Sequence, residues 1–237
     1  MPDAQDAWTG LMAEIVSCRR CPRLVAWREE VARVKRRAYR DEAYWGRPVP
    51  GFGDPDGRVL IVGLAPGAHG ANRTGRMFTG DSSGDFLYAA LHRAGFASQP
   101  NSRHCDDGLT LRDAYITAAC RCVPPDNKPT TEELAACLPF LAQEVALLPR
   151  IRVAVALGRI AFAAMLRVYG VEKPASAAPL FAHNARFSLG AGRPTLIASY
   201  HPSRQNTQTG RLTGQMFDAV WAQARTDLKE ESHCAGM

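Results

Sequence analysis

The stretch Arg58-Val-Leu-Ile-Val62 and the loop that follows it decide the fold class. The loop reads Gly63-Leu-Ala-Pro-Gly-Ala-His-Gly-Ala-Asn-Arg-Thr-Gly-Arg-Met-Phe-Thr-Gly-Asp-Ser-Ser-Gly84 and contains six glycines. Four consecutive apolar residues predict a strand buried on both faces. Glycines let the backbone approach a ligand closely, and open α/β sheets bind ligands at the carboxyl ends of their strands. This loop is therefore the first candidate site.

The rest of the chain repeats the pattern of a buried strand followed by a helix. Thr130-Thr-Glu-Glu133 is a capping box that opens a long helix. A short additional strand is expected near Phe187 in a loop rich in Pro, Gly and Ala. Three further buried strands are expected at 114–118, 151–157 and 195–199. The alternation predicts an α/β fold, a three-layer α/β/α sandwich whose central, mostly parallel sheet has about four strands.

Length and composition bound the organisation of the chain. Its 237 residues suit a single domain over residues 1–229, with a disordered tail at 230–237. No apolar run approaches the roughly eighteen residues that a membrane helix needs. The acidic start has no signal-peptide core, so we expect a cytoplasmic protein, and we expect it to be a monomer.

Positive charge is concentrated near the start of the chain. Residues 18–47 hold ten Lys/Arg and four Asp/Glu, an excess that equals the whole net charge of +6. A charged helix face in solvent is one explanation. Lys35, Arg36 and Arg37, however, lie close to aromatic residues, among them Tyr39 and Trp45, which favours contact with a nucleic-acid backbone.

Four of the seven cysteines form a candidate ligand set. Cys18 and Cys21 make a CxxC pair, Cys122 follows the second expected strand, and Cys137 lies on the capped helix. Four thiolates could hold a [4Fe–4S] cluster or a structural zinc, and their spacing does not separate the two. Cys120 is a rival ligand, although a buried apolar role suits it better. Ordinary free thiols are the remaining alternative.

The first loop is not a known phosphate-binding motif. It lacks the Lys-Ser/Thr ending of a Walker A loop, and no dinucleotide-binding GxGxxG follows the strand. Asp81 stands at the mouth of a helix, where an N-cap is the competing explanation for an aspartate. Phe78, flanked by glycine and polar residues, suits stacking on a flat base, although a place in the core is the alternative.

A second polar loop, Tyr200 to Gly214, follows the last expected strand. It contains His201, Ser203, Arg204 and Asn206 and has almost nothing apolar to bury. Together the two loops offer hydrogen-bond donors, a ring for stacking and few acids. This combination suits a reaction in which negative charge develops on a leaving heterocycle.

These residues together resemble the iron–sulfur uracil-DNA glycosylases, specifically the family 5 (B-type) branch. The resemblance covers nearly the whole chain and rests on Cys18-x-x-Cys21, Pro48-Val-Pro-Gly-Phe-Gly-Asp54, Gly63-Leu-Ala-Pro-Gly-Ala-His-Gly70, Phe78-Thr-Gly-Asp81, Cys122-Val-Pro-Pro125 and His201-Pro-Ser-Arg-Gln-Asn-Thr207. It implies a [4Fe–4S] cluster on Cys18, Cys21, Cys122 and Cys137. It also implies that a flipped, deaminated base is cut from its sugar in DNA, which leaves an abasic site.

Two positions depart from the related family 4 pattern. Leu64 stands where that family has an acidic residue, and Ala118 aligns with an Asn that reads the uracil edge. We therefore expect Asp81 to orient water or to stabilise an oxocarbenium-like sugar, and His201 to donate to a base oxygen with support from Asn206. Without the Asn, the pocket is expected to accept hypoxanthine and xanthine as well as uracil.

The resemblance also assigns binding residues along both loops. We expect Phe78 to stack on the base and the backbone of the first loop to cradle it. The expected substrate-binding residues are Gly63, Ala65, Gly67, His69, Phe78 and Ala118, and the expected DNA contacts are Asn72, Arg73, Lys35, Arg36, Arg37, Ser203 and Arg204. The alternatives are a non-catalytic nucleic-acid-binding protein with structural zinc and a small-molecule hydrolase built on the same sheet.

Overall fold

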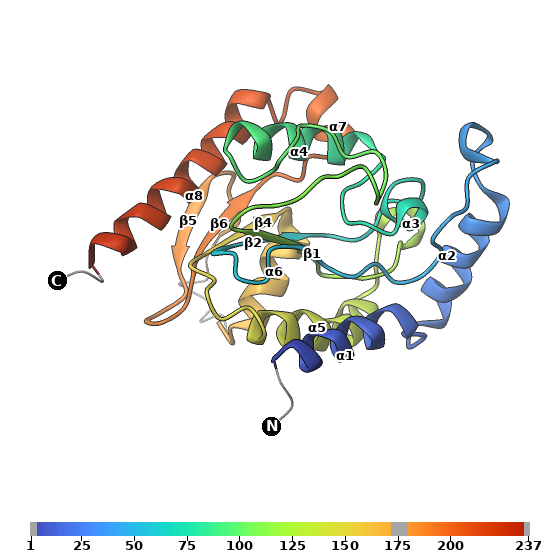
Figure 1. Ribbon diagram of the computed structural model, residues 1–237, viewed down its shortest axis with the longest axis horizontal. Helices are drawn as coiled ribbons and strands as arrows, with labels where there is room; N and C mark the ends of the chain where they lie inside the picture. The colour runs from blue at the N-terminus through green and yellow to red at the C-terminus, as the bar shows by residue number, and fades with distance from the viewer. Residues whose placement is uncertain (1–3, 172–179, 235–237) are drawn as a thin grey trace.

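A computed structural model describes residues 4–171 and 180–234. Its centre is a six-stranded sheet of order β1-β3-β2-β4-β6-β5 (Figure 1). The four inner strands run parallel and the two edge strands are antiparallel. The strands are β1 (Phe52–Gly53), β2 (Val59–Gly63), β3 (Ala114–Ala118), β4 (Val153–Leu157), β5 (Ala185–Ser188) and β6 (Thr195–Ser199).

Helices cover both faces of the sheet (Figure 1). Val59 and Ile61 of β2 pack on the side of α4 (Ser82–Arg93) and α8 (Gly214–Cys234). Leu60 and Val62 point to the opposite side, because side chains alternate along a strand. The helices of that second face are α1 (Ala4–Ser17), α5 (Thr131–Ala146) and α6 (Arg159–Val168). Each inner strand is thus buried on both faces, as its apolar run predicts.

The α/β class, the three layers and the mostly parallel sheet are confirmed, but the expected number of strands is too small. The four expected strands are the inner ones, and the short strand near Phe187 is β5. The strand missed entirely is β1, which has two residues, both half-buried. An edge strand this short carries no apolar run that could reveal it.

The end of the chain departs from the expected tail. α8 runs to Cys234 and so includes residues 230–234, which were expected to be disordered. Residues 235–237 lie outside the described part, and the single-domain boundary stays a prediction. Within the described ranges, no helix combines the length and apolar character needed to cross a membrane.

The carboxyl ends of the inner strands bring distant segments together. The Ala119 amide donates to the Gly63 carbonyl at 3.0 Å, and the Gly158 amide donates to the Ser199 carbonyl at 2.8 Å. Short helices complete this edge and the adjoining end of the molecule. They are α2 (Pro22–Val34), α3 (Ala71–Thr74), α7 (Arg204–Gln208) and the 3-10 turns η1 (Arg37–Tyr39) and η2 (Pro125–Asn127).

Candidate active site

Asp81 holds the first turn of α4 with one carboxylate oxygen and leaves the other available. Its Oδ1 accepts hydrogen bonds from the Ser83 and Gly84 amides, each at 3.0 Å. Its Oδ2 lies against Gly67 and Gly70, where an added Cβ would come within 2.6 and 2.0 Å of that oxygen. Burial raises the pKa of Asp81 despite the two amide donors. The result is a carboxylate fixed in a cradle of glycine backbone.

Phe78 and His201 lie side by side at the same edge of the sheet. Their ring centroids are 5.9 Å apart and the rings are tilted by 30°. Phe78 has a φ of +53°, and a Cβ on Gly63 would come within 2.7 Å of its Cζ. The missing side chain at Gly63 therefore lets the Phe78 ring lie directly on the carboxyl end of β2. Phe78 is half-buried, so part of its ring remains open to a ligand.

His201 is held as a neutral ring. Burial lowers its pKa to about 4, because removal from water disfavours the charged form. Asn206 Nδ2 donates to the His201 backbone carbonyl at 2.9 Å. Asn206 thus fixes the backbone that carries the imidazole and leaves the ring nitrogens without a partner among the described residues.

The expected base cradle is assembled from the ends of β2 and β3. Gly63 pairs with Ala118 in the ladder between these strands, and Ala118 is almost fully buried. Ala65 packs against the cysteine cluster described below. His69 is half-buried and its Nδ1 lies 3.1 Å from the Tyr44 hydroxyl. Burial, followed by the charges of nearby arginines, lowers the pKa of His69.

Asn72 and Arg73, expected to contact DNA, are instead buried. Asn72 Nδ2 donates to the Arg28 carbonyl at 3.3 Å. The Arg73 guanidinium donates to the His69 and Gly80 carbonyls at 2.8 and 3.0 Å, pairs with Glu42 and covers the ring of Tyr39. Arg73 thus holds the first loop together and Asn72 joins that loop to α2, and neither buried side chain is retained among the DNA contacts proposed below. A side chain inside a glycine-rich loop has to bond the many carbonyls around it, and the sequence pattern does not reveal this.

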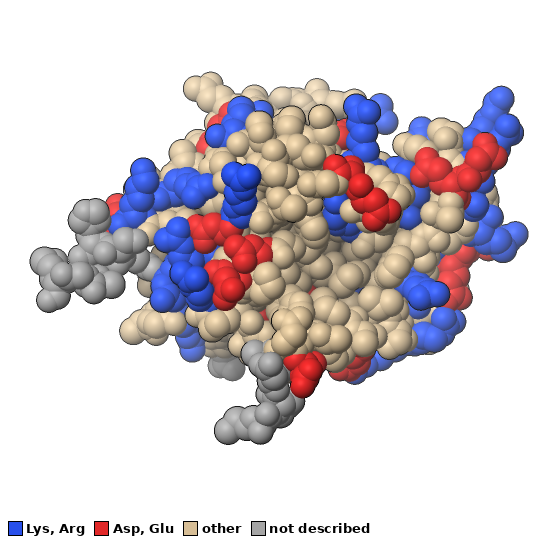
Figure 2. All heavy atoms as spheres, in the orientation of Figure 1, with Lys and Arg blue, Asp and Glu red and all other residues tan. Residues whose placement is uncertain are grey.

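In the basic segment, the Lys35 side chain is bonded to the protein itself, whereas several arginines are exposed. Lys35 Nζ donates to the carbonyls of Arg40 and Glu42 at 3.3 and 2.7 Å and so closes its own loop. Arg36, Arg37 and Arg40 are exposed and line a shallow hollow. Figure 2 shows Lys and Arg side chains gathered on the projecting end formed by α2 and η1, with acidic side chains next to them.

The second loop places its polar residues around α7. The Ser203 hydroxyl caps this helix by accepting from the Asn206 amide at 3.3 Å. Arg204 is exposed in the first turn. Of the two expected DNA contacts in this loop, Arg204 is therefore free to reach a phosphate through its side chain.

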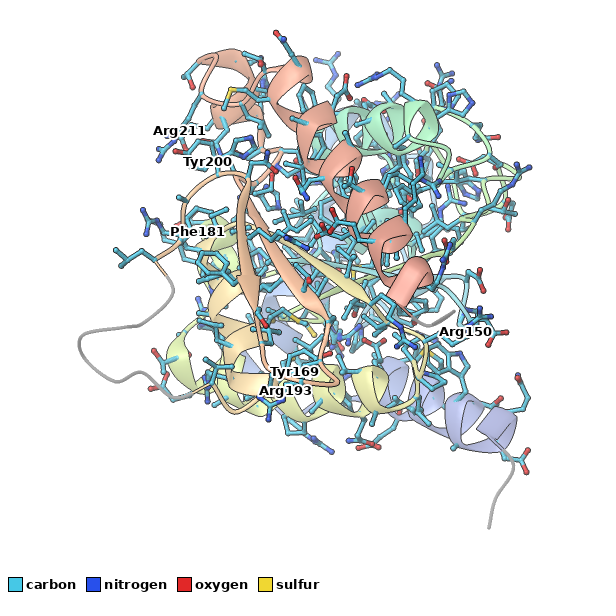
Figure 3. All side chains as sticks on the ribbon, turned by 90° about the vertical axis from the view of Figure 1, so that its left-hand side faces the viewer. Arg150, Tyr169, Phe181, Arg193, Tyr200 and Arg211 are labelled. Carbon is cyan, nitrogen blue, oxygen red and sulfur yellow. The ribbon has the colours of Figure 1, made fainter. Side chains whose placement is uncertain are left out.

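A row of rings and guanidinium groups borders His201 and was not expected from the sequence. Arg211 covers Tyr200 at 4.8 Å, Tyr200 lies 6.1 Å from Phe181, and Arg159 covers Phe181 at 5.0 Å. Figure 3 shows Phe181, Tyr200 and Arg211 one above another along one edge of the molecule. These residues come from three separate segments, so no local motif could have identified them.

The four cysteines of the expected ligand set line one cavity. Cys18 and Cys21 come from the entry to α2, Cys122 from the segment after β3, and Cys137 from α5. The other lining residues are Arg20, Leu24, Val25, Arg28, Pro48, Arg121 and Phe140. The cavity thus combines soft sulfur donors, apolar walls and three arginines.

Cys120, the rival ligand, packs beside this cavity but is not among its lining residues. Its Sγ donates to the Cys122 carbonyl at 3.4 Å. Cys120 also packs beside Cys137, and this contact lowers the pKa of Cys137. Cys120 therefore contacts Cys122 and Cys137 without lining the cavity. This position suits a residue that packs against the ligands and is not itself a ligand.

Comparison with known proteins agrees with this geometry. Residues 50–225 match the model of the uracil DNA glycosylase superfamily. The type-5 uracil-DNA glycosylase of Thermus thermophilus is 60% identical over 211 residues, which are 89% of this chain and 94% of that protein. The type-5 enzyme of Mycobacterium leprae is 55% identical over 91% of this chain and 93% of its own length. A type-4 uracil-DNA glycosylase of Pyrobaculum aerophilum is 37% identical, over 54% of this chain and 57% of its own. The chain therefore belongs to the uracil-DNA glycosylase superfamily and, within it, to the type-5 uracil-DNA glycosylases.

Proposed function

We propose that this protein hydrolyses the N-glycosyl bond of uracil in DNA, in base excision repair, and that the same pocket accepts hypoxanthine and xanthine. The proposal rests on one observation: Asp81, Phe78 and His201 lie at the same edge of the sheet, the edge formed by the carboxyl ends of the inner strands. A carboxylate with a free oxygen, a half-exposed ring and a neutral imidazole are the groups that this reaction needs. We further propose that the enzyme acts as a monomer in the cytoplasm.

The base is bound by stacking and by one directed hydrogen bond. A base flipped out of the duplex stacks on Phe78, and the backbone at the carboxyl end of β2 cradles it. A neutral His201 donates its ring N–H to a base oxygen. As the bond from the sugar breaks, its electron pair moves to the base, and this donor stabilises the developing anion.

Asp81 acts on the sugar side of the breaking bond. Loss of the base leaves positive charge on the sugar, and a carboxylate close to it stabilises that charge. A water molecule then bonds to the sugar carbon, and Asp81 Oδ2 accepts the proton that this water loses. The products are a free base and an abasic site.

The absence of an amide at Ala118 favours a broad range of bases. Ala118 offers a methyl group where the type-4 pattern has an Asn, so no side-chain amide there selects the uracil edge. The test is release of free base from duplexes that each contain one uracil, hypoxanthine or xanthine. Release of all three supports the proposal. Release of uracil alone would contradict the broad range, and binding without any release would contradict the activity.

Exposed arginines near the site are proposed to bind DNA phosphates. Replacing Arg36 and Arg37 with Gln should flatten the dependence of log affinity on log salt by about 0.9 for each phosphate that is no longer neutralised. Arg150→Gln is the matched control, because Arg150 is exposed and precedes β4, at the amino edge of the sheet (Figure 3). If the control changes the slope equally, or if the double variant leaves the slope unchanged, Arg36 and Arg37 do not bind phosphate and are simply exposed to solvent.

The pH dependence of the rate is expected to report Asp81 and not His201. The reaction needs the ionised carboxylate, and burial raises the pKa of Asp81, so activity should fall on acidification at a pH above the ordinary aspartate value. His201 stays neutral down to about pH 4, because burial lowers its pKa to about 4. The check is kcat/KM from pH 4 to 9. An acid limb that persists in Asp81→Asn would belong to another group.

We propose that the cysteine cavity holds a [4Fe–4S] cluster on Cys18, Cys21, Cys122 and Cys137. Thiolates are the preferred ligands of such clusters, and one cavity collects all four. A tetrahedral zinc site holds its sulfurs about 3.8 Å apart, since each Zn–S bond is about 2.3 Å. Among the described residues, no three of these cysteines have sulfurs within 4.8 Å of one another. This wider spacing favours a larger cluster over zinc, and the cluster would tie α2, α5 and the segment after β3 together.

A further inference from the structure

Two arginines in the cysteine cavity each have a buried N–H group without a partner. Arg28 is 2% exposed and Arg121 is 1% exposed, and both line the cavity. The Nε atom of each has no hydrogen-bond partner in the described structure. Buried arginine nitrogens are normally bonded, so these two require an acceptor that occupies the cavity.

The rest of the Arg28 guanidinium is already bonded to the ligand set. One terminal nitrogen donates to Cys122 Sγ at 3.0 Å, and both terminal nitrogens lie 3.2 Å from the Cys18 carbonyl. These contacts fix the plane of the group between two of the four cysteines. Its Nε, held in place by the same contacts, is buried and has no acceptor among the described residues.

Arg121 is fixed from the opposite side. Both of its terminal nitrogens bond the carboxylate of Glu144, one of them at 3.1 Å from Oε1. Glu144 is fully buried and also accepts from the Thr117 hydroxyl at 2.6 Å. The carboxylate holds the two terminal nitrogens of the guanidinium, and the buried Nε atom has no acceptor among the described residues.

We infer that Arg28 and Arg121 are positioning residues for the cluster, and that their Nε–H groups donate hydrogen bonds to its sulfur atoms. This inference rests on the proposed [4Fe–4S] cofactor. Four thiolates bring negative charge into an apolar cavity. The Arg28 guanidinium compensates part of it, whereas the charge of Arg121 is already balanced by Glu144. Hydrogen bonds to sulfur also tune the reduction potential of a cluster and the retention of its iron.

The test uses the full-length protein isolated with its cluster. Arg28→Lys keeps a positive charge and removes the Nε donor, and Arg121→Lys does the same beside Glu144. The matched control is Arg33→Lys, because Arg33 lies on the same helix as Arg28, pairs with the exposed Glu30 and is not among the residues that line the cavity. Two properties are measured: the midpoint potential in a dithionite titration followed by electron paramagnetic resonance, and the rate of iron release to a chelator.

Both Lys variants should show a more negative potential and an iron release faster by about 10–100-fold, the range found when hydrogen bonds to metal ligands are removed. Arg33→Lys should match the wild type in both properties. If Arg121→Lys fails to fold, Arg28→Lys alone tests the inference. Among the described residues, Arg28 is not paired with a buried carboxylate, so its replacement leaves none unpaired. Wild-type values in Arg28→Lys would overturn the inference and leave the cofactor intact. A wild-type protein without iron or visible absorption would instead overturn the proposed cofactor.

Discussion

Asp81→Asn is expected to lower the single-turnover rate of uracil release by about 10²–10⁴-fold, the usual contribution of a catalytic carboxylate. The amide oxygen of Asn can still accept the bonds that Oδ1 takes from the Ser83 and Gly84 amides. The start of α4 is therefore preserved while the charge is removed. Because burial disfavours that charge, the free energy of unfolding at pH 7 should stay equal or rise.

Asp81→Ala separates the two roles of this residue. Alanine removes both the charge and the N-cap, so it should match Asn in activity and lose about 1 kcal/mol of stability. Chemical denaturation and single-turnover rates on the same preparations make the comparison. Full activity in Asp81→Asn would show that Asp81 is only a cap.

Replacing Cys137 with Ser is expected to remove the visible absorption and most of the bound iron, and to lower the melting temperature. The physical reason is that a metal centre bound only by the folded chain contributes its binding energy to folding. Cys137 is the proposed ligand on α5, and the other proposed ligands come from the entry to α2 and from the segment after β3. Iron content, absorption spectra and thermal melts measure the effect.

Two further cysteines serve as controls for this assignment. Cys105→Ser should match the wild type, because Cys105 is exposed and lies outside the cavity. Cys120→Ser should keep its iron, since Cys120 packs behind the ligands. Loss of iron from Cys120→Ser together with its retention in Cys137→Ser would make Cys120 the fourth ligand.

The inner sheet was predictable because its strands are buried on both faces and appear in the sequence as apolar runs. Leu60 and Val62 face one layer of helices while Val59 and Ile61 face the other, so all four must be apolar. β1 was not predictable, because it is an edge strand of two residues with half-buried side chains. Its pairing depends on β3, far along the chain.

The candidate site was only partly predictable, for a related reason. His201 lies just after β6 and Asp81 lies in the long loop after β2, so topology alone brings both to the carboxyl edge of the sheet. Arg73 looks like a DNA contact in sequence, but its donors are taken up by carbonyls of its own loop. The ring that Arg159 covers, Phe181, comes from another segment, and such a contact exists only after folding.

The most direct test compares wild type and Asp81→Asn on two duplexes, one with a single uracil and one with a single hypoxanthine. If Asp81 stabilises the sugar, single-turnover release of both bases should fall by the same factor, because the sugar is common to both substrates. His201 and Phe78 are proposed to contact the base instead, so their variants should change the ratio of the two rates. An Asp81→Asn enzyme that releases either base at the wild-type rate would contradict the role assigned to this carboxylate.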